Sequence, residues 1–337
     1  MTIDKCATAL RPFANPLCVG GFTVICYFLG ASLHRWVVPL VSCYTLFLIL
    51  AWALAKINDR LLQGNFAFNR MWSEEVAVVS GGSSGLGHCI CENLAAKGAT
   101  VINLDIVPPT SKSSADFHQC DCSNKDSVRS AVTYVGESYG PATILVNNAA
   151  CKITGKTIRK LTKAEFMRTL EVNAFGCLNL TQQFLPDLLS AGRGQIVSIS
   201  STTAHISPAT LFDYSSSKAA IICMHECLDA ELEQAGQQIK LLLVTLGQLS
   251  TQLFGGVETP SNFLGPILDP SQVAETIVEA VRQGRGGLLC LPLYASWIPL
   301  MRILPAGFAK AVRRASGIDR AMSNFSHPSI QTETPNR

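Results

Sequence analysis

A glycine-rich turn between an apolar run and a helical pattern is the feature that most constrains the fold of this chain. Residues 76–80 read Val-Ala-Val-Val-Ser, which predicts a strand buried on both faces of a parallel sheet. Gly-Gly-Ser-Ser-Gly-Leu-Gly follows at 81–87, and apolar residues then recur at helical spacing over 88–97. This order is typical of a dinucleotide site, where the helix N-terminus receives a pyrophosphate.

The glycines of this turn have separate expected roles. Gly81 suits a tight turn, Gly85 lets the backbone approach a pyrophosphate, and Gly87 lets the helix lie close to the strand. Their spacing differs from the commoner dinucleotide fingerprint, and an ordinary glycine-rich loop is the alternative. Residues further along the chain must therefore decide.

The chain alternates between strand and helix patterns after the turn. Further strands are expected at 100–104, 117–120, 143–146, 195–199, 239–246 and 287–291. Helices are expected at 125–139, 164–189, 214–234 and 270–282. This alternation predicts an α/β fold, a Rossmann-type doubly wound sheet of seven parallel strands, over a domain at 73–294.

Two uncharged apolar runs, 17–33 and 36–55, precede this domain. Because a bilayer core needs about 20 apolar residues as a helix, they predict an apolar helical hairpin within a membrane-anchoring region at 1–72. Basic residues on both outer flanks favour two cytosolic ends. A cleaved signal peptide and a soluble apolar hairpin are the alternatives.

Composition excludes several classes of protein. Apolar residues make up 48% of the chain and charged residues 15%, a balance too hydrophobic for disorder. The net charge of +3 comes with no basic run interleaved with aromatics, which argues against nucleic acid as a partner. The 13 cysteines are odd in number and lack zinc-site spacing, so we expect free thiols, a reducing compartment and no metal.

Tyr214 and Lys218 open the helix that follows the fifth expected strand. Residues four apart lie on one helix face, so phenol and ammonium project together beyond the strand ends. A phenol has a pKa of about 10, and a neighbouring cation lowers that pKa by favouring the phenolate. The pair can therefore serve as a general acid/base, although this spacing alone also arises by chance.

Several motifs in their order resemble the short-chain dehydrogenase/reductase family over 76–291. They are the glycine turn, Asn-Asn-Ala-Ala at 147–150, mid-helix Asn173, Ser201 thirteen residues before Tyr214, and Tyr214-x-x-x-Lys218. The resemblance implies that Tyr214 exchanges the proton with the substrate oxygen, and that Lys218 lowers the tyrosine pKa and holds the nicotinamide ribose. It further implies that Ser201, with Ser200 as the alternative, bonds the reacting oxygen, and that Asn173 supports a water chain to Lys218.

The resemblance also implies a cofactor groove. Its residues would be Gly81, Ser83, Ser84, Gly85, Leu86, Gly87, Asp105, Asp121, Asn147, Ala149, Tyr214, Lys218, Gly247, Leu249 and Thr251. Asp105 ends the second strand, where a carboxylate bonds a ribose 2′-hydroxyl and repels a 2′-phosphate, so NAD(H) is favoured and NADP(H) is left open. The family's usual Pro-Gly after the sixth strand is Leu246-Gly247 here.

Substrate and partners follow from the apolar segments. Residues 202–212 and 249–268 are rich in large apolar residues, which favours a lipophilic alcohol or ketone. With the apolar lead, the chain resembles the membrane-attached retinol and 17β-hydroxysteroid dehydrogenases. That implies an NAD(P)-dependent oxidoreductase for a retinoid, steroid or fatty alcohol, on the endoplasmic reticulum or a lipid droplet and facing the cytosol, and a homodimer. A biosynthetic NADPH-dependent ketoreductase and a non-catalytic dinucleotide-binding scaffold on lipid are the alternatives.

The last segment, 295–337, is expected to be an amphipathic extension with a flexible tail. Large apolar residues alternate there with Arg and Lys over 297–314. Such a mixture fits a helix lying in a membrane interface, or a helix packed on the sheet edge.

Overall fold

The computed structural model describes residues 2, 4–5, 34–63, 70–257, 259, 261–263, 265–322 and 325. The chain divides into two compact units, Met1–Ala67 and Phe68–Arg337. In the first unit, α3 (His34–Gln63) covers the second apolar run and exposes large apolar side chains such as Phe47 and Trp52. Nowhere in the described residues is there a helix with the length and apolar character needed to cross a bilayer. The run at 17–33 lies outside the described residues, so the expected hairpin is not shown.

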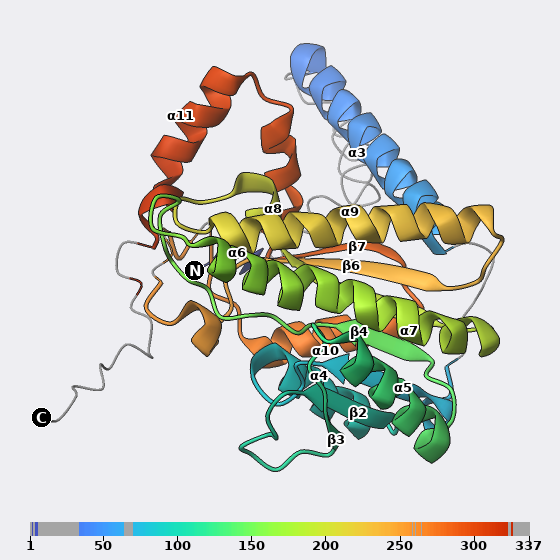
Figure 1. Ribbon diagram of the computed structural model, residues 1–337. Helices are drawn as coiled ribbons and strands as arrows, with labels where there is room; N and C mark the ends of the chain where they lie inside the picture. Colours follow the sequence, from blue (N-terminus) through green and yellow to red (C-terminus); the bar gives the residue numbers. More distant parts are fainter. Residues whose placement is uncertain are drawn as a thin grey trace, which may run out of the picture. The chain divides into compact units, whose positions relative to one another are not determined.

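The second unit contains a seven-stranded, wholly parallel sheet in the order β3-β2-β1-β4-β5-β6-β7 (Figure 1). The strands are β1 (Val76–Ser80), β2 (Thr100–Asp105), β3 (Asp116–Gln119), β4 (Ile144–Asn147), β5 (Gln195–Ser201), β6 (Lys240–Leu246) and β7 (Gly287–Leu291). This confirms the Rossmann-type sheet. The strand order reverses between β1 and β4, which places a ligand site beyond the carboxyl ends of these strands.

Helices cover both faces of the sheet (Figure 1). They are α4 (Gly85–Ala96) and α10 (Pro270–Arg282) on one face, and α5 (Lys125–Tyr139), α7 (Gly176–Ser190) and α9 (Phe212–Gln234) on the other. Along β1, Ala77 and Val79 pack in the α4–α10 layer, whereas Val76 and Val78 pack in the α5–α7 layer. Burial on both faces explains why β1 is apolar without interruption.

The long helix expected at 164–189 is confirmed as one unbroken helical stretch, but its middle turn is π-helical. The stretch consists of α6 (Lys163–Leu170), a π-helical segment η3 (Glu171–Phe175) and α7. A capping box between Thr162 and Glu165 starts α6. The π turn widens the helix around Asn173, and such turns concentrate at functional sites.

Short helices occupy the remaining connections. They are η2 (Trp72–Glu74), α8 (Thr203–Ile206), η4 (Gln252–Phe254), η5 (Leu293–Ser296), η6 (Ile298–Arg302), α11 (Ala306–Ser316) and η7 (Ile318–Arg320). The stretch from 293 to 320 thus forms a series of short helices after the last strand.

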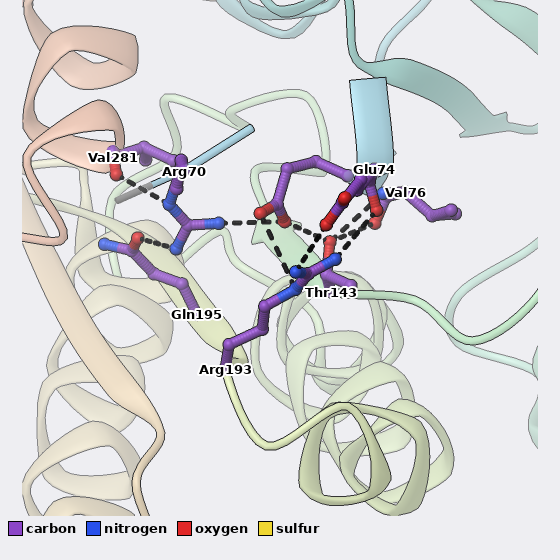
Figure 2. Close-up of polar contacts among 8 residues, drawn as sticks. Arg70, Glu74, Val76, Thr143, Arg193, Gln195 and Val281 are labelled. Atoms are coloured by element: carbon purple, nitrogen blue, oxygen red, sulfur yellow. Dashed lines mark hydrogen bonds and ion pairs between the residues drawn. The ribbon is translucent and has the colours of Figure 1, made fainter. Parts of the chain in front are cut away.

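A buried polar cluster lies at the amino-terminal ends of the central strands, which we call the amino-terminal edge of the sheet (Figure 2). The Arg70 guanidinium donates to Glu75 Oε2 at 3.0 Å, to Gln195 Oε1 at 2.6 Å and to the Val281 carbonyl at 3.0 Å. Thr143 Oγ1 donates to the same Glu75 oxygen. The cluster therefore joins the segment before β1 to the starts of β4 and β5 and to the end of α10.

Candidate active site

The structure brings the four expected catalytic side chains together at the carboxyl end of β5. Ser201 ends that strand, Tyr214 and Lys218 lie in the first turns of α9, and Asn173 lies in η3. All four are buried, with exposed fractions of 5% or less. Lys218 Nζ lies 5.7 Å from the centroid of the Tyr214 ring and donates to the Ile199 carbonyl at 2.9 Å.

Hydrogen bonds distinguish Ser201 from its neighbour Ser200. The Ser200 hydroxyl donates to the Lys218 backbone carbonyl at 3.0 Å, so it serves to join β5 to α9. Ser201 Oγ accepts from both the backbone N–H and the hydroxyl of Thr203, at 3.2 and 3.0 Å. A hydrogen bond from Ser201 also acts to lower the pKa of Tyr214. Ser201 is therefore the serine positioned beside the phenol.

The acidity of the Tyr214 phenol departs from the sequence-based expectation. Burial raises the pKa of Tyr214, and the Ser201 hydrogen bond offsets only part of that rise. Burial also lowers the pKa of Lys218 to about 8. The lowering of the tyrosine pKa that was expected from the lysine is therefore not found, because desolvation disfavours both charged forms and is the largest cause of both shifts.

Asn173 joins η3 to the loop after β4 and to α9. Its Oδ1 accepts the backbone N–H of Cys151 at 2.6 Å, and its Nδ2 donates to Ser217 Oγ at 2.9 Å. The Ser217 hydroxyl in turn donates to the Tyr214 carbonyl at 2.7 Å. Asn173 and Asn147 line one small pocket beside these bonds, and Asn147 Oδ1 is buried there without a hydrogen-bond partner. The water chain to Lys218 stays a prediction.

The glycine turn has the geometry that its sequence indicates. Gly81 has φ +68°, and a Cβ there would lie 2.9 Å from the Ala149 Cα. A Cβ on Gly87 would collide with the Gly81 carbonyl oxygen, so this glycine permits the close approach of α4 to β1. Asn148 was not predicted from the sequence, and its Nδ2 donates to the carbonyls of Ser80 and Gly81 at 3.0 and 3.2 Å. Its place in the Asn-Asn motif was the available signal.

The residues around this turn fit a dinucleotide. Ser84 caps α4 with no side-chain hydrogen bond, and the first turn of α4 carries no acidic residue, so its free N–H groups suit an anion. At Gly85, φ is +55° and an added Cβ would lie 3.5 Å from the Thr251 methyl. Asp105 Oδ2 accepts the Ser83 N–H at 3.1 Å, which holds the carboxylate at the edge of the turn.

Three other expected cofactor residues have identifiable surroundings. Gly247 follows β6, and its N–H donates to the Leu291 carbonyl at 2.7 Å. Leu249 forms an isolated parallel bridge with Leu268. Asp121 lies in the turn after β3, where its Oδ1 accepts from the N–H and hydroxyl of Ser123 at 2.9 and 2.6 Å.

Asp213, directly before Tyr214, was also not predicted from the sequence. It is fully buried, and its Oδ2 accepts the hydroxyls of Thr154 and Thr169 at 2.9 and 3.2 Å. Asp213 therefore fixes the first turn of α9 against α6 and against the loop after β4. Its partners are 44 and 59 residues away in the sequence, so no local pattern could have indicated them.

Apolar side chains surround the Tyr214 phenol. The Tyr214 cluster consists of Ile153, Leu211, Tyr214, Val257 and Met322. Leu253 and Phe254 pack against it, the Phe254 ring edge-on to Tyr214 at 5.6 Å between centroids. Four separate segments of the chain thus contribute apolar surface around the Tyr214 phenol.

Comparison with known proteins supports the same interpretation. Residues 75–261 match a family model described as short chain dehydrogenase. An uncharacterized oxidoreductase, TDA5 of Saccharomyces cerevisiae, is 29% identical over 82% of this chain and 87% of its own length. Human epidermal retinol dehydrogenase 2 is 28% identical over 74% of this chain and 85% of its own. Rat estradiol 17-beta-dehydrogenase 11 is 27% identical over 71% and 83%.

Solved structures agree with these matches. A metagenomic short-chain oxidoreductase in complex with NADP has a TM-score of 0.54 and 26% identity, over 66% of this chain and 99% of its own. The ligand-free aldohexose dehydrogenase of Thermoplasma acidophilum has a TM-score of 0.57 and 26% identity, over 64% and 92%.

Proposed function

The chain belongs to the short-chain dehydrogenase family and is an NAD(P)-dependent oxidoreductase, and from this premise we propose that it interconverts a lipophilic alcohol and its ketone or aldehyde at a membrane. The Tyr214 cluster is the observation that carries this proposal, because its apolar side chains suit a retinoid, steroid or fatty alcohol. The relatives named for retinol and estradiol support the same substrate class.

The proposed mechanism assigns one task to each buried group. The glycine turn, Lys218 and the loop after β6 would hold a nicotinamide cofactor, which would supply or accept the hydride. Tyr214 exchanges a proton with the substrate oxygen, and Ser201 hydrogen-bonds that oxygen. Lys218 places a cation near the phenol and stabilises negative charge there. The Tyr214 cluster excludes water, which strengthens each of these interactions.

Two observations bear on the cofactor. Asp105 at the edge of the glycine turn favours NAD(H), because its carboxylate would repel a 2′-phosphate. The solved short-chain oxidoreductase in complex with NADP supports an NADPH-dependent ketoreductase as the second candidate. The catalytic rates with NADH and NADPH, for wild type and for Asp105→Asn, separate the two: NAD(H) use predicts that only the variant accepts NADPH well.

Membrane attachment rests on the apolar lead. Along α3, Leu46, Phe47, Leu50, Trp52 and Leu54 each expose more than half of their surface. Exposed apolar surface of this extent marks a contact with lipid or protein. Basic residues flank the lead on both sides, which favours attachment with the second unit in the cytosol, at the endoplasmic reticulum or a lipid droplet.

The decisive experiment removes the Tyr214 hydroxyl. Tyr214→Phe should lower kcat by about 10²–10⁴-fold with lipophilic alcohols or ketones, while NADH titration detects nearly unchanged binding. Tyr139→Phe is the matched control, because that hydroxyl donates to Asp116 at the start of the edge strand β3, remote from the site at the end of β5. Activity of Tyr214→Phe within a factor of two of wild type would refute the proposed role.

A further inference from the structure

The C-terminal arm (residues 297–322) turns large apolar side chains away from the core. The exposed fractions are 63% at Trp297, 49% at Leu300, 78% at Ile303, 40% at Leu304, 69% at Phe308 and 46% at Val312. A surface helix of a globular domain normally buries its apolar face. In α11 no residue is buried, so the apolar face of this helix is unpartnered among the described residues.

Basic residues occupy the face of α11 opposite its apolar residues. Phe308 and Val312 lie one turn apart on one side of the helix, and the exposed Lys310 and Arg314 each lie two residues further along, on the other side. Between 297 and 320 the sequence has five basic residues and one acidic residue, Asp319. Asp319 is paired with Arg313 at 2.6 Å, so it does not neutralise the exposed cations of α11.

We propose that the C-terminal arm docks on an anionic lipid surface and that the substrate reaches Tyr214 from that surface. Exposed Trp, Phe and Leu beside Lys and Arg are the pattern of a helix lying in a membrane interface, and the excess of positive charge complements anionic headgroups. Between the two arrangements open for this segment, the outward apolar face favours the interface over packing on the sheet. This inference rests on the proposed function, because it assumes a lipophilic substrate.

Two arginines join the arm to the active site. Arg302 Nη2 donates to the Ala204 carbonyl at 2.9 Å. Arg313 donates to the carbonyls of Ile206 and Ser207 at 2.6 and 2.7 Å. These carbonyls belong to α8 and the residue after it, and α8 begins two residues after Ser201. The lipid-facing part of the arm is therefore fixed to the segment that carries the catalytic serine.

The far end of the arm enters the Tyr214 cluster. Met322 is 8% exposed and packs with Leu211 and Tyr214. One continuous segment of the chain thus connects an exposed apolar face to the apolar surroundings of the Tyr214 phenol.

The test uses the full chain in vesicles of phosphatidylcholine, with or without phosphatidylserine, made with brominated acyl chains. The difference in tryptophan quenching between wild type and Trp297→Phe isolates the contact of Trp297 with lipid. We expect Trp297 to be quenched in vesicles that contain phosphatidylserine, and we expect this quenching to be lost in the double variant Lys310→Glu/Arg314→Glu. Each basic residue near an anionic surface contributes about fivefold in partitioning, so two reversals weaken docking by at least about 25-fold. Lys125→Glu/Arg129→Glu on α5 is the control of equal charge change.

Activity in the same vesicles separates this inference from the proposed function. The arm variant should raise KM for a long-chain alcohol about tenfold or more and leave KM for a short, water-soluble alcohol unchanged. No Trp297 quenching in either vesicle overturns docking, even if the enzyme is fully active. Trp297 quenching in a chain that oxidises or reduces nothing supports docking while refuting the proposed function. If chemical cross-linking joins the arms of two chains and the brominated lipid does not quench Trp297, the arm mediates self-association and the proposal is overturned.

Discussion

Replacing Arg70 by methionine should destabilise the second unit strongly without altering catalysis. The guanidinium is 1% exposed and its Glu75 partner 0%, so the variant leaves a carboxylate buried without its cation (Figure 2). Removing one partner of a buried ion pair costs about 3–5 kcal/mol. Glu75 keeps the Thr143 hydroxyl and has Arg193 Nε at 3.9 Å, which places the expected loss in unfolding free energy near the lower end, about 3 kcal/mol.

Urea unfolding followed by circular dichroism measures this loss. Adding Glu75→Gln to the Arg70→Met variant removes the unpaired charge. The loss of unfolding free energy in the double variant should therefore be smaller than the sum of the losses in the two single variants, by at least about 1.5 kcal/mol. Arg129→Met is the control: its pair with Asp126 is 62% and 88% exposed and contributes about 0–1 kcal/mol. A loss below about 1 kcal/mol in Arg70→Met would refute the argument that this ion pair is energetically isolated from water. A large change in kcat/KM would refute the separation of the amino-terminal edge from the site.

Two further predictions concern pH. Burial lowers the pKa of Lys218 to about 8, so the rate of carbonyl reduction should fall above that pH as the cation is lost. Lys218→Arg should move this fall to higher pH. A pH profile of kcat/KM in which the alkaline limb does not move would contradict this prediction. Burial also lowers the pKa of His225 to about 4 from 6.5, so the folded state binds fewer protons than the unfolded state between these values. Stability is therefore full above pH 6.5 and should fall by about 2 kcal/mol from pH 7 to pH 5, a loss that His225→Gln abolishes in urea unfolding at the two values.

Local chemistry explains what the sequence predicted correctly. The β1 run is apolar because both its faces are covered, and Gly81 and Gly87 are required by atoms a few residues away. Because these constraints act within short segments of the chain, the periodicity and spacing of the residues reveal them. The π-helical turn at Asn173 and the ties of Asp213 depend instead on tertiary contacts across 22 to 59 residues. The local sequence patterns of these two helices therefore indicate neither the π turn nor the hydrogen bonds of Asp213.

The acidity of Tyr214 shows why spacing alone could not predict the chemistry. Four residues of separation correctly place Lys218 near the phenol, where a cation is expected to lower a phenol pKa. Burial instead raises this pKa, and the apolar residues around the phenol, among them Leu211, Val257 and Met322, converge only in the folded chain. Because Met322 belongs to the C-terminal arm, the segment that we propose to dock on lipid also contributes to the apolar surroundings of the phenol.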